Sequence, residues 1–133
     1  YAPILSPMLT LTVILATILV GNGLLMLAAP EDWDHVVPTG PYTGAFNPHF
    51  VRDIGCAYLV AGGGFVWLLR NPAARPAAMA GALFLLLHAL VHVWDGFAGR
   101  QSIEHLIEDI PGVFILPGLA LYLAWSPRRV SHA

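Results

Sequence analysis

The chain has no lysine and one cysteine, and only 11% of its 133 residues are charged. Ordinary soluble domains carry about 25% charged residues, so this sequence does not contain the polar groups needed to cover a surface that faces water. The single Cys56 excludes an intramolecular disulfide framework and any metal site built from several cysteines. Six arginines against eight acids leave no basic footprint for nucleic acid. These absences favour a protein whose solvent is the lipid bilayer.

Long apolar segments dominate what is present. A helix of about 20 apolar residues crosses a bilayer core, and we expect helices at about residues 5–29, 49–69, 76–95 and 103–125. Residues 30–48 contain four prolines and are expected to form an outer loop. Asn47 and Ser102 suit the N-caps of the second and fourth helices. The predicted fold is a single domain over residues 1–133, an all-α integral membrane protein with four transmembrane helices in an antiparallel bundle.

The arginines predict the orientation of this bundle. Arg70 and Arg75 lie between the second and third segments, and Arg128 and Arg129 follow the fourth. Because cytoplasmic loops are enriched in arginine and lysine, both termini are expected on the cytoplasmic side, in a bacterial inner membrane. All eight acids then fall on the outer side. A cleaved signal peptide is the alternative for the first segment, although its apolar run exceeds the usual length of about 7–15 residues.

Ionisable residues gather in one stretch, His88–Asp109, which holds three histidines and four acids. Such groups are costly at membrane depth unless they are paired, hydrated or bound to an ion. Residues spaced at i, i+4 and i+7 share a helix face, and faces of this kind reach the same outer level from three helices. The predicted metal ligands are His49 and Asp53 on the second helix, His88, His92 and Asp95 on the third, and His105, Glu108 and Asp109 on the fourth.

These residue types predict a metal-binding membrane protein. Imidazole suits Fe, Cu and Zn, carboxylates add oxygen ligands, and helical bundles build metal sites from facing side chains. We expect one ion or two near the outer leaflet, with redox chemistry on a small or lipid-soluble substrate. Metal-assisted hydrolysis fits the same ligands. No residue is assigned a catalytic role.

One spacing resembles a known family. His88-x3-His92-x12-His105 is similar to the acid-x3-His-x12-His pattern in a membrane subunit of copper-dependent membrane monooxygenases, with His88 at the position of the acid. The resemblance covers three residues and implies copper as a candidate metal.

Three alternatives use the same residues without such a metal site. In an ion-pair network or a proton relay, Arg52 or Arg100 would bridge to an acid of the fourth helix, and His92 would hydrogen-bond Asp95. The acids in question are Glu104, Glu108 and Asp109. Two axial imidazoles would bind haem b. The chain would otherwise be a non-catalytic small subunit of a larger membrane complex, or a homo-oligomer, docked through small-residue stripes such as Gly62–Gly64.

Overall fold

The computed structural model of the protein describes residues 6–37 and 44–126, and within them all regular secondary structure is helical, with no strand. The long helices are α1 (Pro7–Ala28), α3 (Pro48–Arg70), α4 (Arg75–Phe97) and α6 (Leu116–Trp125). The short elements are α2 (Pro30–Val36), the 3-10 turn η2 (Pro72–Ala74), α5 (Ile103–Glu108) and the π-helix η3 (Ile110–Ile115). The predicted all-α class is confirmed.

Three helical segments are long and apolar enough to cross a membrane: Pro7–Ala28, Pro48–Arg70 and Pro72–Phe97. Their starts follow the local signals in the sequence. The side chain of Asn47 accepts hydrogen bonds from the backbone N–H groups of His49 and Phe50, and Pro48 occupies the first turn of α3. Ser102 caps α5 by accepting a hydrogen bond from the backbone N–H of His105 at 3.3 Å. Both predicted N-caps are therefore confirmed.

The fourth segment is apolar but irregular. Ile110–Trp125 is shorter than the three candidate spans, and the chain passes from α5 through the π-helix η3 before α6 begins. Pro111 lies at the start of η3 and Pro117 at the start of α6. Proline has no N–H and its ring clashes with the carbonyl four residues earlier, so a regular α-helix cannot run through these positions. The break falls immediately after Asp109.

The expected outer loop contains a helix. Pro30 occupies the first turn of α2, and Glu31 and Asp32 lie in the same turn, where the positive end of the helix dipole favours acids. The indole Nε1 of Trp33 donates a hydrogen bond to Asn22 Oδ1 at 2.8 Å, which ties α2 to α1. The prolines that indicated a loop here therefore include one that starts a helix.

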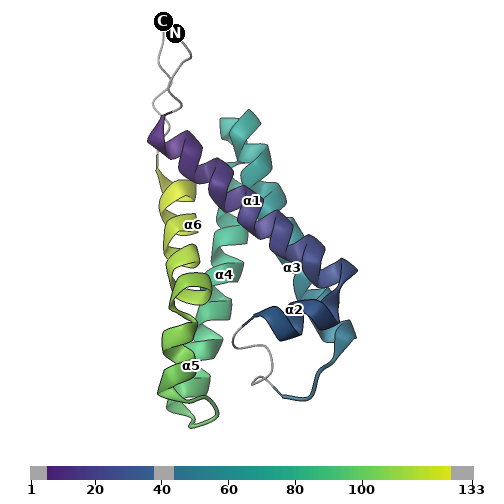
Figure 1. The fold of residues 1–133 in the computed structure, drawn as a ribbon. Coiled ribbons are helices and arrows are strands. Elements are labelled where there is room, and N and C mark those ends of the chain that lie inside the picture. Colours follow the sequence, from purple (N-terminus) through teal and green to yellow (C-terminus); the bar gives the residue numbers. More distant parts are fainter. Residues whose placement is uncertain (1–5, 38–43, 127–133) are drawn as a thin grey trace, which may run out of the picture.

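The long helices pack in the order α1, α3, α4, α6, and α1 makes little contact with α6. Figure 1 shows α1 crossing the other helices diagonally, so that the bundle is closed at the end where α6 finishes and open at the end that carries α2 and α5. Glycines allow the close crossing of α1 and α3. A Cβ atom on Gly23 would lie 2.8 Å from the carbonyl oxygen of Gly55, and one on Gly62 would lie 2.7 Å from Val20 Cγ2.

Candidate functional site

A buried carboxylate lies where α5 gives way to η3. The side chain of Asp109 is 1% exposed, and its Oδ2 accepts a hydrogen bond from His92 Nδ1 at 2.7 Å and another from Gln101 Nε2 at 2.7 Å. A buried charge is tolerated only when it is paired and hydrogen-bonded. Two short bonds to one carboxylate, one of them from an imidazole, meet that condition.

Asp109 fixes the ring of His92. An ionised carboxylate can only accept hydrogen bonds, so a neutral His92 paired with it would carry its hydrogen on Nδ1 and leave the lone pair on Nε2. The side chain of His92 is 14% exposed. His88, one helical turn earlier on α4, places its ring centroid 4.8 Å from that of His92 at an angle of 69°. The two imidazoles therefore lie beside each other on one face of α4.

Aromatic rings hold His88. Its ring stacks on Phe84 with centroids 6.2 Å apart and meets the ring of Tyr58, on α3, edge to face at 6.4 Å. Tyr58 in turn meets Phe84 edge to face at 5.8 Å. The second imidazole is thus positioned by packing, whereas His92 is positioned by a carboxylate.

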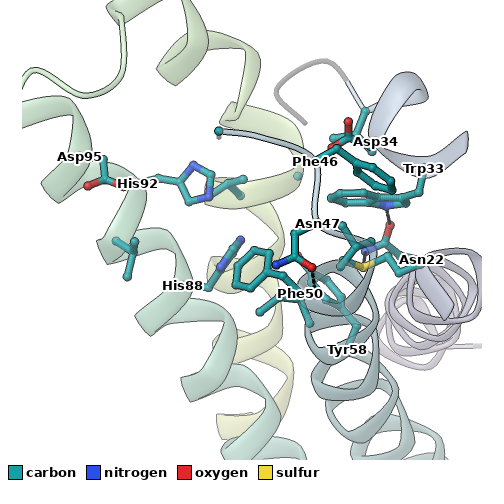
Figure 2. Close-up of a pocket in the computed structure, with 18 of the residues that line it drawn as sticks. Asn22, Trp33, Asp34, Phe46, Asn47, Phe50, Tyr58, His88, His92 and Asp95 are labelled. Carbon is teal, nitrogen blue, oxygen red and sulfur yellow. Dashed lines mark hydrogen bonds between the residues drawn. The ribbon is translucent and has the colours of Figure 1, made fainter. Parts of the chain in front are cut away.

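Both imidazoles border a cavity of about 630 Å³ at the open end of the bundle. Figure 2 shows His88 and His92 on α4 facing this space, with Tyr58, Asn22 and Trp33 on the opposite side. Most of the remaining wall is apolar or aromatic, and includes Ile18, Met26, Phe46, Phe50, Ile54, Val91, Val113 and Leu116. The site is therefore a largely apolar cavity with a pair of histidines on one wall.

α3, which corresponds to the predicted second helix, turns toward the cavity a different face from the one that carries the predicted ligands His49 and Asp53. His49 Nε2 lies 3.4 Å from Asp53 Oδ2, but their side chains are 86% and 63% exposed, and neither lines the cavity. α3 buries Val51 and Tyr58 instead. Tyr58 comes nine residues after His49, and at about 100° per residue that separation places the two on opposite faces of the helix.

The other predicted ligands are spread around the end of the bundle. Asp95 lines the cavity and pairs with Arg100 at 3.1 Å. Glu108 is exposed, and His105 is half-buried on α5. Within residues 6–37 and 44–126, no three or more histidine, cysteine, aspartate or glutamate side chains form a group that could hold a metal ion. The predicted metal site stays a prediction, and of its residues His88 and His92 lie beside each other at the cavity.

Sequence reasoning did not select Tyr58 or Gln101. Tyr58 is an isolated hydroxyl in an apolar helix, and Gln101 is the last residue of the turn before the Ser102 cap. One sequence signal could have pointed to Tyr58. It shares a face of α3 with Gly55 and Gly62, and this face lies against α1.

Comparison of the chain with protein-family models, with curated proteins and with solved structures finds no match.

Proposed function

We propose that the protein is a membrane-embedded metal-binding protein in which His88 and His92 bind the ion and Asp109 orients His92. The observation that carries this proposal is the 2.7 Å hydrogen bond between His92 Nδ1 and the buried carboxylate of Asp109. Histidines that bind metals almost always donate the other ring N–H to a carboxylate, a carbonyl or water, and this partner fixes the tautomer. The ring nitrogen left with a lone pair is then the metal ligand.

The spacing of the two histidines supports the proposal. Histidines at i and i+4 of a helix supply two ligands to one zinc ion in helical metal sites, and imidazole also suits Fe and Cu. The predicted set of eight ligands is thereby narrowed to two imidazoles and one supporting carboxylate. Open coordination positions would face the cavity, where a small or lipid-soluble substrate would complete the site. Redox chemistry at Fe or Cu is the proposed use.

The proposal includes a four-span topology, with both termini cytoplasmic and the cavity near the outer leaflet of a bacterial inner membrane. In this topology α5, η3 and α6 together form the fourth span. Arg75 Nη1, at the start of α4, donates a hydrogen bond to the carbonyl oxygen of Trp125, at the end of α6, at 3.1 Å. This contact supports an antiparallel pair of spans, with their ends at one membrane face on the side of the arginines.

Metal analysis of the purified protein tests the proposal. The wild-type protein is expected to carry Fe, Cu or Zn in stoichiometric amount, and His88→Ala and His92→Ala are each expected to abolish it. Asp109→Asn should weaken metal binding about 10–100-fold, because the imidazole loses its carboxylate partner. His49→Ala is the matched control, since His49 is exposed and lies outside the cavity. The assignment would be refuted if the wild-type protein stayed metal-free after supplementation with Fe, Cu or Zn, or if His49→Ala alone lost the metal. A Soret band in the visible spectrum would indicate haem instead.

One observation favours a second candidate, a non-catalytic subunit whose polar residues fix the helix register. Asp109 already has two partners, and Asp95 pairs with Arg100. In that case the protein would bind no metal, and it would copurify in mild detergent with a larger membrane complex or as a homo-oligomer. Size measurement of the detergent complex, combined with the metal analysis, separates the two candidates.

A further inference from the structure

A tyrosine hydroxyl on α3 has no hydrogen-bond partner among the residues that the structure describes. Tyr58 is only 9% exposed and lines the cavity from α3. In the part of the chain that the structure describes, its interactions are the ring contacts with Phe84 and His88, and its hydroxyl forms no hydrogen bond. Buried tyrosine hydroxyls usually find a partner. The Tyr58 hydroxyl is therefore available to donate a hydrogen bond to a molecule in the cavity.

The position of this hydroxyl connects it to the histidine pair. The ring of Tyr58 lies 6.4 Å from the ring of His88, and Figure 2 shows the two residues facing each other from α3 and α4. A ligand that accepts the hydrogen bond of Tyr58 would occupy the same cavity as the two imidazoles.

The size, the aromatic lining and the charge of the cavity indicate what kind of ligand fits it. A volume of about 630 Å³ lies within the range of small-molecule sites, about 300–1,000 Å³. Trp33, Phe46 and Phe50 line it with aromatic rings, which pack favourably against a flat ring. Arg100, the cation among the described lining residues, already pairs with Asp95, so an anionic headgroup would find no free positive charge.

We infer that the cavity binds a lipid-soluble quinone, whose ring carbonyl accepts a hydrogen bond from the Tyr58 hydroxyl. A quinone has the three features that the cavity requires: a flat ring, an apolar tail and an uncharged acceptor oxygen. The inference rests on the proposed function in one respect, namely that this cavity receives the substrate.

Quenching of Trp33 fluorescence by a decyl-substituted benzoquinone tests the inference in lipid nanodiscs. The exposed Trp67, Trp94 and Trp125 are first replaced by phenylalanine, so that Trp33 alone reports. Quenching should be saturable, and excess decylbenzene, which has the tail but no carbonyl, should not displace the quinone. Tyr58→Phe should raise the Kd about two- to tenfold, the range for one neutral hydrogen bond. Tyr122→Phe, an exposed tyrosine on α6, should leave the Kd unchanged.

Three results would overturn the inference: quenching that rises linearly with quinone, equal Kd values for Tyr58→Phe and Tyr122→Phe, or full displacement by decylbenzene. Ile54→Phe, which adds bulk to the cavity from α3 without adding a second indole, gives an independent check, because it should weaken saturable quenching while circular dichroism stays unchanged. The same titration on metal-stripped protein separates the two proposals. Saturable quinone binding to a protein that never binds metal defeats the metal assignment alone, and a metal-loaded protein without saturable quenching defeats the quinone inference alone.

Discussion

Replacing Gly62 by alanine should weaken the packing of α1 on α3. The new methyl group would lie 2.7 Å from Val20 Cγ2, 3.0 Å from the backbone nitrogen of Val20 and 3.1 Å from Leu19 Cβ. A flexible side chain could turn away, but a backbone nitrogen cannot, so α1 itself must move. Overpacking of this kind typically costs about 1–3 kcal/mol.

The neighbouring glycine supplies a matched control. A Cβ atom on Gly63 would have no atom within 4 Å. Alanine is favoured over glycine within a helix by about 0.5–1 kcal/mol, because glycine loses more backbone entropy on folding. Gly63→Ala should therefore stabilise the protein slightly. Because the backbone gain is common to both sites, the two variants should differ by the overpacking cost alone, about 1–3 kcal/mol.

The free energy of unfolding can be measured by titrating the detergent-solubilised protein with dodecyl sulfate and following helicity by circular dichroism. Gly62→Ala should unfold at a lower detergent fraction than wild type, and Gly63→Ala at an equal or higher one. If both variants unfolded at the same detergent fraction, α1 and α3 would not approach as closely as the structure shows. The diagonal crossing of α1, which leaves one end of the bundle open, would then be in question.

Three further perturbations test the site and its orientation. Asn22→Ala leaves the indole N–H of Trp33 without its acceptor, so the free energy of unfolding should fall by about 1–3 kcal/mol. The fluorescence emission of Trp33 should also shift, and an unchanged spectrum would contradict the contact. A double-mutant cycle of His92→Ala and Asp109→Ala should give a coupling energy of about 0.5–3 kcal/mol, whereas additive losses would show that the pair does not interact. In a cysteine-free variant, His49→Cys should react with an impermeant maleimide in intact cells; labelling only after permeabilisation would reverse the proposed orientation.

The sequence predicted the helices well where the controlling signals are local. Asn47 with Pro48, and Ser102, start helices through contacts within the first turn, so the residues themselves carry the information. The fourth segment was harder, because Pro111 predicts that the α-helix is interrupted but not which irregular form replaces it. Its π-helical turn depends on how the segment packs against α4.

The candidate site was predicted in part, because periodicity says which residues share a face and not which face points inward. On α4 the histidines continue the stripe of small and buried residues through Gly81 and Leu85, so the predicted face is the buried one. On α3 the stripe with Gly55 lies away from His49, and the residues that line the cavity include Phe50, Ile54 and Tyr58. The small residues, which mark close helix contacts, were the better guide to the inward face.

Burial also decides which of the acids belongs to the site. All eight acids were assigned to the same end of the bundle, and all lie among the described residues, yet Asp109 alone is buried. The turn between α4 and α5 explains how this carboxylate is held. In this turn the chain reverses direction through Gly99, which has a φ of 69°. The backbone N–H groups of Arg100 and Gln101 donate hydrogen bonds to the carbonyl oxygen of Asp95.

That same turn supplies the second partner of Asp109, because the side chain of Gln101 reaches the carboxylate at 2.7 Å. α4 contributes the histidines, the turn contributes the amide, and the break before Pro111 holds the acid. One continuous hairpin, His88–Asp109, therefore builds the polar wall of the cavity, and α3 with α1 supplies the apolar wall opposite. A quinone bound here would contact both walls, and a metal ion would contact the wall that carries the histidines. Either ligand binds the folded protein and is expected to stabilise it, so a denaturation midpoint that does not rise with a ligand would argue against that ligand.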